Sequence, residues 1–192
     1  MNLSITPGTN NVGAYIKNID LRKLNETLSL EIKKTLNQIG VIFIKKQNLG
    51  TDEYQTFAKN IGQPVVYPRL KGLDEKFPFI NVIERKPEDK NLSFGSSWLH
   101  QDTSYLSNDR PRYTMLMGIE IPQGQGNTIF SSGFNAYERL PEGIKNKIKN
   151  ATGIFSSAGP IAITRLEREK EMGIKSSESM EAEHPIVKTV EG

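Results

Sequence analysis

The chain has 192 residues, a length that suits one domain with a sizeable core. Its 25 Lys and Arg are scattered among 22 Asp and Glu, with no clustered basic face that would indicate a nucleic-acid partner. The absence of cysteine excludes disulfides and thiolate chemistry, and no apolar run is long enough to span a bilayer or to form a secretory signal. We therefore expect a cytoplasmic protein with no membrane partner, and a homo-oligomer remains open.

The first sixty residues predict alternating strands and helices. The expected strands lie at 3–6, 12–16 and 41–45, and the last of them is expected to be buried. One helix is expected to end at 39, and a second helix is expected to run over 51–61. Thr27 or Ser29 is the expected cap of the first helix, and Gly40 and Gly62 are expected to end the two helices. This region has no glycine-rich phosphate loop, so a nucleotide site has little support.

The rest of the chain predicts more strands, separated by turns and polar loops. The expected elements are strands at 79–84, 112–121 and 128–131, a turn at 122–127, helices at 134–140 and 143–149, and a strand that begins at His184. Segment 156–183 is polar and rich in charge, and we expect it to be a mobile insertion with a solvated helix at 165–171.

The residues that suggest chemistry lie in the stretch 98–105. His100 is one of only two histidines, and Asp102 follows two positions later. On a strand or strand end, side chains at i and i+2 leave the same face, so an imidazole and a carboxylate would aim at one point. They are two thirds of the facial triad that binds non-haem Fe(II). A His-x-Asp tripeptide is common by chance, however, and an exposed histidine beside a loop aspartate is the alternative reading.

A longer ordered set of motifs surrounds this pair. The set comprises Trp98, His100-Gln101-Asp102, Ser104-Tyr105, Arg110-Pro111, Gly124–Thr128 and Ala136–Pro141, with Val12–Ala14, Ile19–Leu21, Gly40–Phe43 and Phe57–Gly62 upstream and His184–Val187 downstream. In this order and spacing, the chain resembles the taurine dioxygenase family of Fe(II)- and 2-oxoglutarate-dependent oxygenases over nearly its whole length.

The resemblance implies a fold and an activity. The implied fold is a double-stranded β-helix, a mainly β jelly roll of the clavaminate synthase type with flanking helices. The implied enzyme uses Fe(II), 2-oxoglutarate and O2 to hydroxylate a small anionic or polar substrate, and it releases succinate and CO2. His100 and Asp102 would be metal ligands, and the Thr128 hydroxyl would bind the distal carboxylate of 2-oxoglutarate.

Some positions depart from the family pattern. Leu99 separates Trp98 from His100, so we interpret Trp98 as a packing residue. Tyr67 falls near a substrate-contacting tyrosine of the taurine enzymes, but the histidine that precedes that tyrosine is absent here, which argues against taurine as the substrate. Thr103 and Phe155 are further candidates for the substrate pocket.

Two residues that the family requires do not occur in these 192 residues. They are a second iron-binding histidine and, shortly after it, an arginine that pairs with the cosubstrate's distal carboxylate. His184 is the only other histidine, but it precedes Pro185, aligns with a non-ligand histidine and has no arginine after it. We therefore expect a jelly roll that is incomplete at its C-terminal end, the N-terminal portion of a longer oxygenase, with unpaired strand edges and weak or no activity by itself.

Two other functions remain open. The chain would be an inactive, truncated paralogue if its jelly roll binds a partner or ligand without turnover. It would be a hydrolase or isomerase of the cupin type if it uses another divalent metal.

Overall fold

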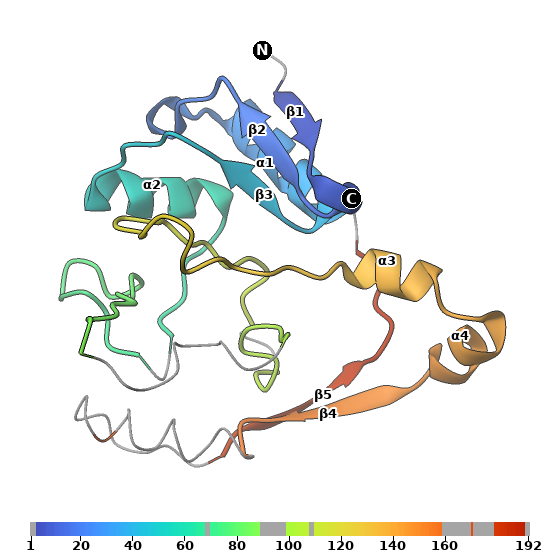
Figure 1. Cartoon of the computed structure of the whole chain (residues 1–192). Coiled ribbons are helices and arrows are strands. Elements are labelled where there is room, and N and C mark those ends of the chain that lie inside the picture. The colour runs from blue at the N-terminus through green and yellow to red at the C-terminus, as the bar shows by residue number, and fades with distance from the viewer. Residues whose placement is uncertain are drawn as a thin grey trace. The chain divides into compact units, whose positions relative to one another are not determined.

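The computed structural model divides the chain into two compact units (Figure 1). The first unit comprises residues 1–63, 115–149 and 187–192, and the second unit comprises 64–114 and 150–186. The structure describes residues 3–67, 70–88, 99–107, 110–158, 170 and 179–190. No helix in these ranges combines the length and the apolar character that a membrane crossing needs.

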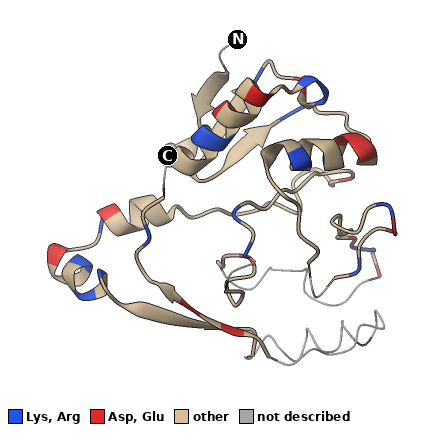
Figure 2. Cartoon of the chain, turned by 180° about the vertical axis from the view of Figure 1, so that it is seen from behind, with Lys and Arg blue, Asp and Glu red and all other residues tan. Residues whose placement is uncertain are grey.

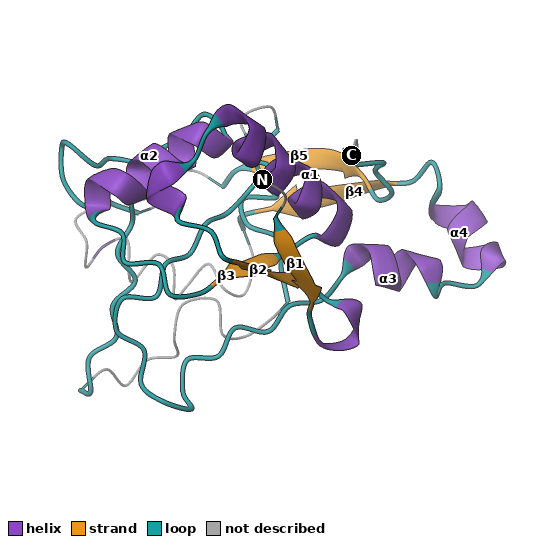
Figure 3. Cartoon of the chain, turned by 90° about the horizontal axis from the view of Figure 1, so that it is seen from above, coloured by secondary structure: helices purple, strands orange, loops and turns teal. Residues whose placement is uncertain are grey.

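A three-stranded sheet with one crossover helix organises the first unit (Figure 3). Strand β1 (Ser4–Pro7) pairs antiparallel with β2 (Ala14–Lys17), and β2 pairs parallel with β3 (Ile42–Ile44). Parallel neighbours need a crossover, and α1 (Glu26–Ile39) supplies it. The 3₁₀ turns η1 (Thr9–Asn11) and η2 (Leu21–Lys23) complete this region. The predicted strands are confirmed, although β3 is half-buried rather than buried.

Helix α1 packs one face into the core of the first unit. Ile32, near the middle of the helix, is fully buried. The predicted cap residues were wrong, because the helix begins at Glu26 and the Oδ1 atom of Asn25 accepts a hydrogen bond from the Leu28 amide at 2.9 Å. Gly40 ends the helix with a φ of +89°, a conformation that favours glycine, as predicted.

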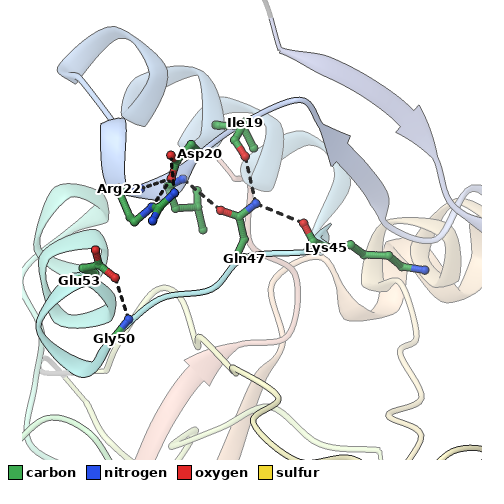
Figure 4. Close-up of polar contacts among 8 residues, drawn as sticks. Ile19, Asp20, Arg22, Lys45, Gln47, Gly50 and Glu53 are labelled. Carbon is green, nitrogen blue, oxygen red and sulfur yellow. Dashed lines mark hydrogen bonds and ion pairs between the residues drawn. The ribbon is translucent and has the colours of Figure 1, made fainter.

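The segment between β3 and α2 (Thr51–Ile61) is fixed by one glutamine (Figure 4). The Gln47 amide nitrogen donates to the carbonyls of Ile19 and Lys45 at 3.0 and 3.2 Å, and its oxygen accepts from the Leu21 amide at 3.1 Å. Gln47 therefore ties η2 to the end of β3. In α1 the acidic Glu26 and Glu31 precede Lys33 and Lys34, and α2 begins with acidic residues and has Lys59 in its last turn, so both helices carry charges of both signs (Figure 2).

Two short helices lie in the later part of the first unit, close to the predicted ranges. They are α3 (Gly133–Glu138), which is capped by the Ser132 hydroxyl, and α4 (Glu142–Ile148). The turn predicted before them is also present, with the Gln125 amide donating to the Pro122 carbonyl at 3.2 Å.

The second unit contains an antiparallel pair, β4 (Thr152–Ser156) and β5 (Glu181–Pro185). Strand β4 was not predicted, and β5 begins three residues before His184 and ends at Pro185, where the sequence predicted a strand through Val190. Both ends of the expected insertion at 156–183 therefore lie in strands. Residues 159–178 of this segment, which include its predicted helix, lie outside the described residues apart from Lys170, as does Trp98.

Three predicted strands, at 79–84, 112–121 and 128–131, are not strands in the structure. A strand needs a continuous ladder of backbone hydrogen bonds to a neighbouring strand, and no described segment forms such a ladder with these residues. Several of their apolar side chains are exposed, with Ile119 and Ile129 exposed by 81% and 79%.

Candidate metal site

The His100 imidazole and the Asp102 carboxylate lie side by side in the second unit. His100 Nε2 is 3.2 Å from Asp102 Oδ1, and the two side chains are 50% and 44% exposed. The predicted strand geometry was wrong, because His100 lies in irregular chain and Asp102 begins a turn that runs to Tyr105. The turn, rather than a strand face, directs the carboxylate back toward the imidazole.

The second oxygen of the Asp102 carboxylate is held by a residue that sequence reasoning missed. The Thr114 hydroxyl donates to Asp102 Oδ2 at 2.8 Å, a short bond to a charged acceptor. With Oδ2 engaged, Oδ1 is the oxygen that faces His100. Threonine is common in strands and turns, and nothing in the sequence around Thr114 indicates this role.

Thr103 follows Asp102 and is the most constrained residue of the turn. Its φ of +51° lies in the left-handed region, which is a genuine outlier for a β-branched residue. The side chain is only 5% exposed, and within the described part of the chain its hydroxyl has no hydrogen-bond partner. The Leu106 amide donates to the Thr103 carbonyl at 2.9 Å and closes the turn.

Tyr67 and Phe155, the other candidate substrate residues, also belong to the second unit. The Tyr105 hydroxyl donates to the Tyr67 hydroxyl at 3.3 Å, which joins Tyr67 to the turn that begins at Asp102. Phe155 lies on β4, and its ring centroid is 5.5 Å from that of His184. Both tyrosines and Phe155 are half-buried.

His184 and Thr128 are placed differently from the His100 and Asp102 pair. His184 Nε2 lies 2.9 and 3.0 Å from the carbonyl oxygens of Ser104 and Leu106, so this nitrogen contacts backbone. Thr128 is an exposed residue of irregular chain in the first unit, so its role toward 2-oxoglutarate rests on the resemblance. In the described ranges, no three His, Cys, Asp or Glu side chains gather as a metal-binding cluster.

Two curated relatives span nearly all of the chain. An alkylsulfatase of Acinetobacter baylyi is 29% identical over 188 residues, which are 93% of this chain and 56% of that protein. An alpha-ketoglutarate-dependent sulfate ester dioxygenase of Pseudomonas putida is 25% identical over 195 residues, with 98% of this chain and 62% of that protein covered. The chain thus spans little more than half the length of these relatives.

A solved structure and a family model agree with these relatives. A Burkholderia xenovorans protein assigned as an alpha-ketoglutarate-dependent taurine dioxygenase superposes with a TM-score of 0.70 at 22% identity. The superposition covers 97% of this chain and 58% of that one, and it shows a shared fold. The family model described as "Taurine catabolism dioxygenase TauD, TfdA family" matches residues 4–191. The chain therefore belongs to the TauD/TfdA family of taurine catabolism dioxygenases.

Proposed function

We propose that the chain is the N-terminal portion of an Fe(II)- and 2-oxoglutarate-dependent dioxygenase, in which His100 and Asp102 supply two of the three protein ligands to iron. The observation that carries the proposal is the 3.2 Å approach of His100 Nε2 to Asp102 Oδ1. An imidazole nitrogen and a carboxylate oxygen that lie this close together would both be within reach of one metal ion. The pair therefore fits one metal ion.

The surroundings of the pair also suit a metal that must bind small molecules. Both side chains are about half exposed, which leaves room for further ligands. Thr114 holds the distal carboxylate oxygen of Asp102, as hydrogen-bonded neighbours of metal ligands commonly do. When bound, the iron and 2-oxoglutarate would supply O2-dependent oxidative decarboxylation to succinate and CO2, coupled to hydroxylation of the substrate. His100 and Asp102 hold the metal, and the Thr128 hydroxyl binds the distal carboxylate of 2-oxoglutarate.

The substrate that we propose is a small anionic molecule. The names of the two curated relatives, an alkylsulfatase and a sulfate ester dioxygenase, support a sulfate ester more than taurine. Tyr67, Thr103 and Phe155 are the proposed pocket residues. The hydroxyl pair of Tyr67 and Tyr105, together with the buried Thr103 hydroxyl, offers polar groups beside the turn that carries Asp102.

The remaining parts of the site are proposed to lie in a continuation of the chain. The relatives are longer than this chain, which supports a third ligand, a histidine, and a cosubstrate-binding arginine beyond residue 192. The same continuation would pair with segments 79–84, 112–121 and 128–131 and complete one jelly-roll domain. We further propose that 156–183 is an insertion in that domain and that the protein works in the cytoplasm.

The test has two steps. The coding sequence after Gly192 is expected to encode a histidine followed closely by an arginine. The extended protein, with Fe(II), 2-oxoglutarate, O2 and an alkyl sulfate, is then expected to form succinate in step with substrate loss, and its His100→Ala variant is expected to form none. Succinate formation that persists in the His100→Ala variant would contradict the ligand assignment. A stop codon after Gly192, with no turnover of 2-oxoglutarate, would contradict the enzymatic function.

A further inference from the structure

His184 makes an unusual contact for a histidine on a strand. It lies on β5, where it pairs across the sheet with Gly153 of β4. Its Nε2 atom reaches two backbone carbonyls that lie about 80 residues earlier in the chain, Ser104 O at 2.9 Å and Leu106 O at 3.0 Å. Both belong to the turn that follows Asp102.

These two acceptors determine what the His184 nitrogen does. A carbonyl oxygen accepts hydrogen bonds and cannot donate one, so Nε2 must carry the hydrogen that both carbonyls share. A protonated Nε2 has no lone pair for a metal ion. His184 therefore acts through this nitrogen as a hydrogen-bond donor to backbone.

The ring of His184 is held in this orientation by the sheet around it. The Phe155 ring packs against it, with the centroids 5.5 Å apart and the planes inclined by 52°. Phe155 also covers Gly153, where a Cβ atom would lie only 3.1 Å from Phe155 Cε2. The glycine opposite His184 thus leaves the space in which Phe155 supports the imidazole.

The turn that His184 contacts needs such support. Thr103 has a φ of +51°, and left-handed backbone is unfavourable for a residue with a branched side chain. Strained conformations persist only where the surroundings fix them. The Leu106 amide closes the turn on the Thr103 carbonyl, and His184 binds the carbonyls of Ser104 and Leu106. Asp102 is the residue immediately before this strained position.

We infer that His184 is a positioning residue, which clamps the turn at 103–106 to β5 through Nε2 and so keeps the Asp102 carboxylate directed at the metal site. The role in metal binding rests on the proposed function, whereas the clamp on the turn does not. His184, the second histidine of the chain, thus supports the site without being a metal ligand.

The experiment compares four forms of the chain: wild type, His184→Ala, His184→Gln and Ile154→Ala. Gln places an amide nitrogen near the position of Nε2 and can still donate to the carbonyls. Ile154 lies on the same sheet but is 66% exposed, so its truncation is a matched control. Hydrogen exchange of the Leu106 amide is measured without metal, and Mn²⁺ affinity is measured by calorimetry.

In His184→Ala we expect the Leu106 amide to exchange at least tenfold faster and Mn²⁺ to bind about tenfold more weakly, the lower end of the effect of such supporting residues. Both values should return toward wild type in His184→Gln and stay unchanged in Ile154→Ala. Unchanged exchange in His184→Ala would overturn the clamp. Faster exchange with unchanged Mn²⁺ affinity would overturn the positioning role. Loss of Mn²⁺ binding in His184→Gln with normal exchange would identify His184 as a ligand, against the inference. If the wild type binds no Mn²⁺, the proposed function fails, and the exchange rates still decide the clamp.

Discussion

Replacing Thr114 with Val removes the hydroxyl that holds Asp102 and changes little else in the size of the side chain. The lost bond is 2.8 Å long and ends on a carboxylate oxygen. Hydrogen bonds to charged groups make a net contribution of about 1.5–3 kcal/mol. The Asp102 side chain is 44% exposed, so water replaces part of the interaction. We therefore expect the free energy of metal binding to weaken by about 1.4 kcal/mol. That loss corresponds to about tenfold weaker metal binding.

The assay for Thr114→Val is an anaerobic titration with Fe(II), in which binding is measured by calorimetry. Thr114→Ser keeps the hydroxyl and serves as the control, with an affinity expected near that of the wild type. Thermal unfolding of the metal-free variants shows whether the fold is intact. If Thr114→Val binds Fe(II) as tightly as Thr114→Ser does, the hydroxyl does not orient Asp102 and the reasoning from this bond is wrong.

Three further predictions concern stability and charge in the first unit. Asn25→Ala removes the cap of α1 and should lower the free energy of unfolding by about 1 kcal/mol in urea titration, whereas Asn25→Asp should retain most of it. Ile32→Ala should cost about 2–5 kcal/mol in the same assay because Ile32 is fully buried, while Leu30→Ala, at a position on the same helix that is 55% exposed, should cost far less. The Arg22 side chain hydrogen-bonds to Asp20 and lowers the pKa of that carboxyl below its ordinary 3.8. The ionised carboxylate therefore stabilises the fold above pH 3.8, and this contribution is lost as the pH falls through the lowered pKa of the folded state. In Arg22→Gln the Asp20 titration midpoint, followed by NMR, should rise toward 3.8, and an unchanged midpoint would contradict the assignment.

The elements that could be predicted from sequence are those whose signals are local. The helix around Ile32 and its glycine stop depend on spacing and on one residue that tolerates a positive φ. The cap was mispredicted because several polar residues lie near the start of the helix. Only the backbone conformation shows that Asn25 is the last residue with extended dihedral angles before the helix begins. Local patterns therefore gave the helices to within a few residues.

The strands depended on partners that a local pattern does not reveal. Segment 112–121 has the composition of a strand, yet it forms no strand pairing with any described segment and leaves Leu116 70% exposed. Strand β4 contains Gly153 and was missed, although it pairs along its whole length with β5. Pairing over a long sequence separation decides both outcomes.

The candidate site likewise combines residues with a local sequence signal and residues that only the fold brings there. The His100 and Asp102 pair was found from a tripeptide, because the two residues are only two positions apart and local backbone geometry can bring their side chains together. Thr114 lies twelve residues from Asp102, and His184 lies about eighty residues from the turn that it contacts, so only the folded chain brings them there. The left-handed Thr103 that makes the turn possible has no sequence signature, since threonine is a poor choice for that conformation.

Paramagnetic NMR tests the central claim, that one metal ion lies between His100 and Asp102, most directly. Mn²⁺ added to the chain at increasing ratios should broaden the His100 ring signals and the Asp102 and Thr114 backbone signals before any others. In Asp102→Asn this selective broadening should disappear, while the rest of the spectrum stays unchanged. Selective broadening centred on another part of the chain, or the same broadening in Asp102→Asn, would contradict the account.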